Sequence, residues 1–117
     1  MTDEQIVKQN EKFAKFMGYE GLIFANIYYI FTDSMFSAHP LKTNYDVHQN
    51  WNYIMEIVIE LNKWEGVEII IKGDECTFKY GSKVKARHAY FDNLIHSVYD
   101  VITVAVDFIQ EKTEVKI

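Results

Sequence analysis

The chain has 117 residues and a formal net charge of −5. A chain of this length suits one domain, so residues 1–117 are predicted to fold as a single domain. Its hydrophobic fraction of 49% and aromatic fraction of 15% exclude global disorder, because they supply enough apolar surface for a packed core. The net negative charge argues against nonspecific binding to nucleic acids or to anionic membranes.

Cys76 is the single cysteine of the sequence. One cysteine cannot form an internal disulfide, and it cannot supply a cysteine-based metal site within one chain. The first residues are polar and acidic, without the apolar stretch of a signal peptide, and no apolar run approaches the roughly 20 residues that span a bilayer. We therefore expect a reduced, cytoplasmic protein with no membrane segment.

The first predicted element is a helix that begins at Thr2 and ends at Gly18. Thr2 and Gln5 have the spacing of a capping box, in which each side chain accepts a hydrogen bond from the other residue's backbone. The segment from 21 to 36 follows, and its nearly continuous apolar run fits either a strand or a buried helix. Its aromatic content favours a strand over residues 26–32, followed by a loop over residues 37–49 that contains the only proline.

A central helix is predicted over residues 50–64, with Asn50 as its N-cap. Apolar side chains recur there at steps of three and four residues, as on one face of a helix. The members of this apolar stripe are Trp51, Ile54, Met55, Val58 and Leu61, widened by Ile57 and Trp64.

After Gly66 the apolar period changes to two. Residues 67–72, 75–80 and 83–90 alternate, and short turns separate them, so a three-stranded antiparallel meander is predicted. The last element, residues 92–111, is rich in valine but places its apolar residues at helical steps, and Asp92 is its expected N-cap. The predicted class is therefore α+β: a small antiparallel sheet of three or four strands with three helices, the two long ones packed on one face.

Catalytic and metal sites find little support in the residue spacing. None of the four histidines, at 39, 48, 88 and 96, forms a metal-ligand spacing with another. Cys76 lies in a predicted strand, where an inert thiol is the ordinary interpretation. We therefore assign no catalytic residue, no metal and no cofactor, and keep an enzyme that uses His48 or His88 as an alternative.

Two groups of residues are candidates for binding. Basic residues alternate along residues 83–90, so that Lys83, Lys85 and Arg87 would form a one-sided row. Together with His88 and Tyr90 they form a candidate site for a small anionic ligand, although positive residues on a strand also prevent edge-to-edge aggregation. The second candidate is an interaction surface formed by the aromatic residues Tyr28, Tyr29, Phe31 and Phe36.

Three short motifs carry a family resemblance: KFMGYE (15–20), VHQNWNYIMEIVIEL (47–61) and SVYDVITVAVDFI (97–109). Their order resembles a group of short uncharacterised proteins from bacteriophages and Bacteroidetes genomes. The resemblance implies a shared fold pattern and a phage origin, and it carries no activity.

The leading functional hypothesis is a small non-enzymatic interaction protein, such as a phage accessory protein that acts on a host factor. The alternative is a protein that sequesters a small anionic ligand, for example a nucleotide signal. Because a short chain carries so much aromatic surface, we also expect a homodimer.

Overall fold

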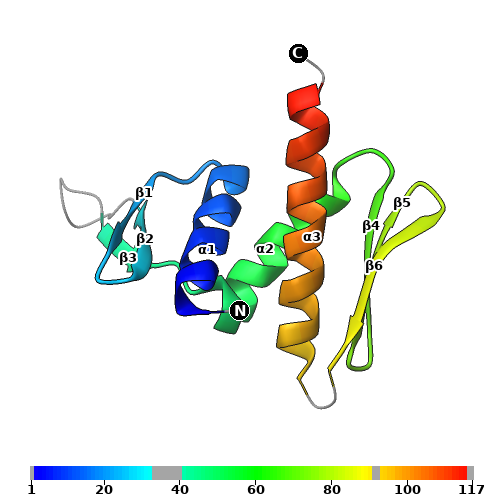
Figure 1. Ribbon diagram of the computed structural model, residues 1–117, viewed down its shortest axis with the longest axis horizontal. Helices are drawn as coiled ribbons and strands as arrows, with labels where there is room; N and C mark the ends of the chain where they lie inside the picture. Colours follow the sequence, from blue (N-terminus) through cyan, green and yellow to red (C-terminus); the bar gives the residue numbers. More distant parts are fainter. Residues whose placement is uncertain (1, 33–40, 91–92, 116–117) are drawn as a thin grey trace. The chain divides into compact units, whose positions relative to one another are not determined.

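The computed structural model describes residues 2–32, 41–90 and 93–115 (Figure 1). The chain divides into two compact units, Met1–Val47 and His48–Ile117. The elements of the first unit are α1 (Asp3–Met17), β1 (Gly21–Phe24), β2 (Ile27–Thr32) and β3 (Leu41–Asn44). After the short 3-10 helix η1 (Val47–Gln49), the second unit contains α2 (Trp51–Asn62), β4 (Val67–Lys72), β5 (Glu75–Tyr80), β6 (Lys83–Ala89) and α3 (Leu94–Val115).

Helix α1 begins and ends as its sequence predicts. The Thr2 hydroxyl accepts a hydrogen bond from the Gln5 backbone, and the Gln5 side chain accepts one from the Thr2 backbone, which completes the capping box. Gly18 ends the helix in the left-handed conformation, with φ of +81°. Helix α1 packs against β1 and β2, and its Phe13 and Ala14 are fully buried.

The sheet of the first unit has the order β1-β2-β3, and both strand pairs are antiparallel. Strand β2 confirms the strand predicted over residues 26–32, whereas β1 and β3 were not predicted. Ala25 and Asn26 join β1 to β2 with φ angles of +50° and +60°, as in the two-residue hairpin turn whose twist matches the strands. Alanine is rare at such a position, so the sequence carried only a weak signal for this hairpin.

Alternation gives this first sheet an inner and an outer face. Tyr28 and Ile30 of β2 are buried on the face that packs on α1, with 5% and 1% of their surfaces exposed. The intervening Phe31 is 39% exposed on the outer face. Neighbouring strands add further apolar surface to the outer face, because Leu22 pairs with Tyr29 and Phe24 pairs with Ile27.

The sheet of the second unit has the order β4-β5-β6 and is antiparallel, which confirms the predicted meander. Helix α3 packs on β5 and β6, and α2 packs on α3 and β4. Figure 1 shows α3 running alongside this sheet. The core of the unit is formed by fully buried side chains from the middle strand and both helices: Ile54, Ile57, Leu61, Cys76, Phe78, Val98, Val101 and Ile102.

Helices α2 and α3 each differ from their prediction in one detail. The buried stripe of α2 is centred on Ile57, while Trp51 and Met55 are 40% and 38% exposed, because the sheet and α3 cover a face rotated away from them. At the start of α3, the expected N-cap Asp92 lies outside the described residues. The side chain of Asn93 accepts a hydrogen bond from the His96 backbone, as an N-cap does.

The predicted α+β class is confirmed, with three α-helices and six strands among the described residues. These strands form two three-stranded sheets, where one sheet of three or four strands was expected. The extra strands are β1, at the start of the apolar run 21–36, and β3, within the loop predicted over residues 37–49. Among the described residues, no helix is both long enough and apolar enough to cross a membrane.

Gly21 occupies a position that a larger residue cannot share. A Cβ atom there would overlap the carbonyl oxygen of Tyr29 and lie 2.7 Å from the hydroxyl of Tyr28. We expect Gly21→Ala to lower the free energy of unfolding by about 2–3 kcal/mol in a denaturant titration, as overpacking does. Gly18→Ala is the control, because its Cβ would meet no atom within 4 Å and only the left-handed backbone costs about 1 kcal/mol. Equal losses for both variants would contradict this account.

Candidate functional site

A bulge in β6 changes the arrangement predicted for the basic row. Phe78 pairs with Ala86 while the next residue, Lys79, pairs with Val84, so Lys85 is an extra residue between two pairs. The Lys85 ammonium lies 5.6 Å from the ring centroid of Phe108 on α3. Lys85 therefore reaches toward the helix side of the sheet.

Arg87 lies on the opposite face of the same sheet. Arg87 pairs across the strands with Thr77. Thr77 follows the buried Cys76 in the sequence and so points to the opposite face, and the Arg87 guanidinium forms an ion pair with Glu75. The prediction that Lys83, Lys85 and Arg87 form a one-sided row is therefore wrong, because the bulge interrupts the alternation on which it rested. Lys83 is exposed at the start of β6, opposite Tyr80.

His88 and Tyr90, the other two predicted ligand contacts, belong to a stack of three rings. The rings of Tyr90 and His96 are 4.1 Å apart with planes 5° apart, and His88 stacks on Tyr90 at 6.1 Å. His96 is on α3, so this ring stack (His88, Tyr90 and His96) joins the end of β6 to the first turns of the helix. Two of the four histidines thus flank one tyrosine.

Asp100 lies beside the ring stack. Its carboxylate accepts a hydrogen bond of 2.8 Å from the Tyr90 hydroxyl and lies 3.4 Å from Nε2 of His96. The hydrogen bond to Asp100, followed by the negative charge of that carboxylate, raises the pKa of Tyr90 above its ordinary value. The phenol is therefore protonated at neutral pH and cannot act there as a base.

Ser97 anchors the same region from within. Its side chain is fully buried, and its hydroxyl accepts a hydrogen bond of 2.9 Å from the Tyr90 backbone. The hydroxyl also donates to the carbonyl oxygen of Asp74, at 2.8 Å. One serine of α3 therefore holds both the turn between β4 and β5 and the end of β6, which makes the ring stack a structural junction.

The remaining chemical candidates are not members of the ring stack. His48 packs edge-on against Tyr99 at 6.2 Å, and His39 lies outside the described residues. Cys76 is fully buried, and burial raises its pKa to about 11, so its thiol is protonated at neutral pH. In the part of the chain that the structure describes, no group of three or more His, Cys, Asp or Glu side chains could hold a metal ion.

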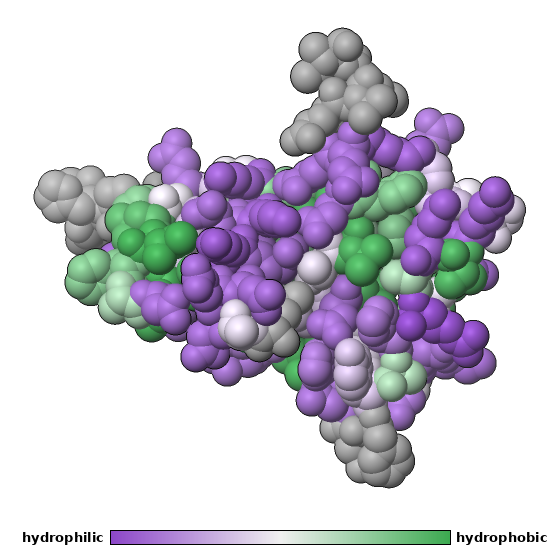
Figure 2. All heavy atoms as spheres, viewed as in Figure 1, coloured by the Kyte–Doolittle hydropathy of each residue, from purple (hydrophilic) through white to green (hydrophobic). Residues whose placement is uncertain are grey.

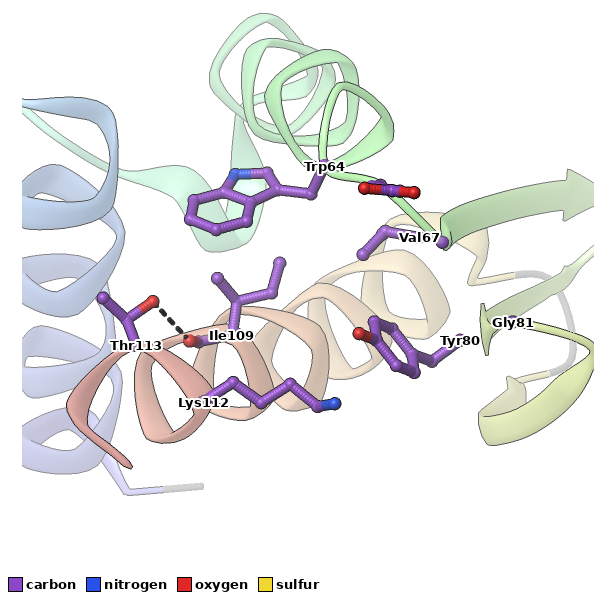
Figure 3. A pocket seen from close by; sticks show the side chains of 9 residues that line it. Trp64, Val67, Tyr80, Gly81, Ile109, Lys112 and Thr113 are labelled. Atoms are coloured by element: carbon purple, nitrogen blue, oxygen red, sulfur yellow. Dashed lines mark hydrogen bonds between the residues drawn. The ribbon is translucent and has the colours of Figure 1, made fainter. Parts of the chain in front are cut away.

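A cleft of about 520 Å³ opens in the second unit between the end of α2, the β5–β6 turn and the last turns of α3 (Figure 3). Figure 3 shows Trp64 on one side of it, Tyr80 and Lys112 on the other, and Ile109 between them. Val67 completes the apolar lining, and Glu65 adds a carboxylate to the lining. No pattern in the sequence predicts this site.

Lys112 is the cation of this cleft. Its ammonium lies 4.0 Å from the ring centroid of Tyr80 and 5.0 Å from that of Phe108. Those two rings are themselves in contact, with centroids 5.0 Å apart. Cation–π attraction thus holds a positive charge at the mouth of an aromatic cleft, within reach of a bound anion.

The predicted interaction surface is only partly assembled. Phe31 is exposed and Tyr29 half-buried on the outer face of the first sheet, but Tyr28 is buried on the inner face. Phe36 lies outside the described residues. Leu22 and Phe24, which were not predicted, extend this outer face, and Lys42 lies over the rings of Phe24 and Tyr29 at 4.7 and 4.4 Å.

Comparison with known proteins adds no relative, because no family model, no curated protein and no solved structure matches the chain.

The pKa of Tyr90 makes a prediction about stability in alkali. A folded-state pKa above 10.0 means that the folded protein holds this proton more tightly than the unfolded chain. The resulting stabilisation is complete below about pH 10 and is lost as the pH rises through the folded-state pKa. We expect wild type to lose more unfolding free energy than Tyr90→Phe between about pH 8 and pH 11 in urea titrations. Parallel losses in both proteins would show that the hydrogen bond to Asp100 does not hold the proton.

The buried thiol makes a second prediction. At about pH 8, we expect iodoacetamide to modify Cys76 in the folded protein about a hundredfold more slowly than in guanidinium, because burial suppresses both access and thiolate formation. Mass spectrometry measures the rate. A Ser82→Cys variant in a Cys76→Ala background is the control, since residue 82 is exposed in a turn and should react quickly in the folded protein. Comparable rates for the two cysteines in the folded state would contradict the burial of Cys76.

Proposed function

We propose that this chain is a non-enzymatic binding protein for a small, flat molecule that carries negative charge. The observation that supports this function most directly is the grouping of Trp64, Tyr80 and Lys112 around one cleft. The aromatic side chains offer apolar area and stacking, and the ammonium offers a counter-charge. A small anionic ligand is the alternative that the sequence suggests, but its site is here the cleft and not the basic row.

The size and chemistry of the cleft fit this ligand class. A volume of about 520 Å³ lies within the roughly 300–1,000 Å³ that is usual for small-molecule sites. Val67 and Ile109 make its floor apolar, with 8% and 4% of their surfaces exposed, so a ring system can displace water there. Glu65 also lines the cleft and carries the charge opposite to that of Lys112, so it would favour ligands whose negative charge lies on the Lys112 side.

The test uses a pair of dyes that differ in charge. 8-Anilinonaphthalene-1-sulfonate is flat, apolar and anionic, while N-phenyl-1-naphthylamine has similar rings and no sulfonate. In a Trp51→Phe background Trp64 is the only tryptophan, so energy transfer from Trp64 reports dye binding, and variants of the cleft residues locate the site.

We expect Lys112→Gln to weaken binding of the sulfonate about fivefold, the value of an exposed ion pair, and to leave the neutral dye unchanged. Glu65→Gln should tighten the sulfonate about twofold, since it removes a repulsive charge. Lys42→Gln is the matched control, because Lys42 also lies over two aromatic rings but belongs to the first unit. If Lys112→Gln and Lys42→Gln have the same effect, the cleft is not the anion site.

A second candidate function is the interaction protein that leads the sequence-based hypotheses. The exposed apolar residues of the first sheet, Leu22, Phe24 and Phe31, favour it, because such surface commonly marks a protein contact. The phage origin and the host factor rest on the resemblance alone and stay predictions.

A further inference from the structure

We propose that β1 pairs antiparallel with β1 of a second copy of this chain, so that the two first-unit sheets join across a two-fold axis. This strand belongs to the first unit and the cleft to the second, so the pairing does not depend on the proposed ligand.

Strand β1 is an edge of its sheet, since in the described part of the chain β2 is its only partner in the order β1-β2-β3. Phe24 and Ile27 flank the two-residue turn, and in such hairpins they form a hydrogen-bonded pair. Hydrogen-bonded pairs alternate along the ladder, so the Phe31 amide donates to the carbonyl of Glu20, at 3.0 Å. The amides and carbonyls of the alternate residues, Gly21 and Ile23, therefore point away from β2, toward the open edge.

The side chains of this edge strand are apolar and exposed to water, which favours pairing with another strand. Phe24 is 62% exposed, Ile23 is 49% exposed and Leu22 is 38% exposed. Figure 2 shows apolar side chains gathered over the part of the molecule where Figure 1 places β1, β2 and β3. An apolar edge strand with unpaired backbone groups is a template for pairing, and natural edges usually carry charge or proline to prevent it.

One pairing register uses the whole strand. When Leu22 faces Leu22 of the second copy, Gly21 of each copy faces Ile23 of the other, so the outward backbone groups of both strands bond to each other. In the same register Glu20 of each copy faces Phe24 of the other. The neighbouring registers place Glu20 opposite either Leu22 or the turn residue Asn26.

Charge complementarity selects the Leu22-centred register. Glu20, Phe24 and Lys42 lie on the same face of the sheet, and the Lys42 ammonium is 4.7 Å from the Phe24 ring. When Glu20 of one copy faces Phe24 of the second copy, the exposed Glu20 carboxylate of the first copy comes beside Lys42 of the second. The two-fold axis makes this contact twice, which suits a second copy as the partner.

The experiment mixes two charge-reversed variants. Glu20→Lys alone would place two lysines together, and Lys42→Glu alone would place two glutamates together. We expect each variant alone to weaken the dimer at least about tenfold in sedimentation equilibrium, since like charges face each other in a strand pair. The equimolar mixture should form heterodimers with near wild-type affinity, because both of its contacts again join opposite charges.

Glu68→Lys and Lys83→Glu are the matched controls, because they change the net charge equally at exposed positions of the second unit. Both should leave the dimer unchanged. Ile23→Pro removes an amide that points away from β2, so it should abolish the dimer while circular dichroism shows an unchanged fold.

A thiol probe fixes the register. In a non-hydrogen-bonded pair the facing Cα atoms are about 4.5 Å apart, which is within disulfide reach. Leu22→Cys should therefore form a covalent dimer on mild oxidation, and wild type, with its buried Cys76, should not.

Two results would overturn the proposal. The first is a monomer at high micromolar concentration, because the open edge of β1 is then not covered by a second copy. The second is a dimer that persists with Ile23→Pro and with each charge-reversed variant, because that dimer would form through another surface. A mixture that fails to restore the dimer would reject the contact between Glu20 and Lys42, and with it the register.

Discussion

Cys76 and Phe78 lie fully buried on the middle strand of the second unit, where α3 covers them, and most other features of that unit depend on this packing. Burying these two residues fixes which face of the sheet meets the helices. It places Tyr80 on the helix side, where its ring meets Phe108, and it leaves Thr77 and Glu75 on the other face. The cleft, the Lys112 ammonium over Tyr80 and the ring stack all lie on this helix-covered side of the sheet.

Local rules predicted the helices and the meander well. The capping box at Thr2 and the cap at Asn50 are local interactions, so their sequence signals survive in any tertiary setting. The valine-rich last element is a helix because its apolar period, and not its intrinsic propensity, matches the surface that it covers. The class could therefore be predicted from the sequence, even though the number of sheets could not.

The candidate site was missed for reasons that lie beyond local sequence. Trp64, Tyr80 and Lys112 come from three segments, and no periodicity relates them. The prediction of the basic row was wrong for a different reason. A single bulge at Lys85 moves the residues before it to the other face of the sheet, and an alternating sequence pattern does not reveal a bulge. The hairpin turn at Ala25 and Asn26 lacks the glycine that normally announces such a turn.

Each compact unit consists of one uninterrupted stretch of chain, and this has a consequence for synthesis on the ribosome. Contacts that are close along the sequence close small loops, so they form early and quickly. The sheet of the first unit can therefore assemble while α3 is still being translated, because domains fold as units in the order in which they emerge. On a polysome, neighbouring nascent chains would expose the same apolar strand before the second half of either protein exists.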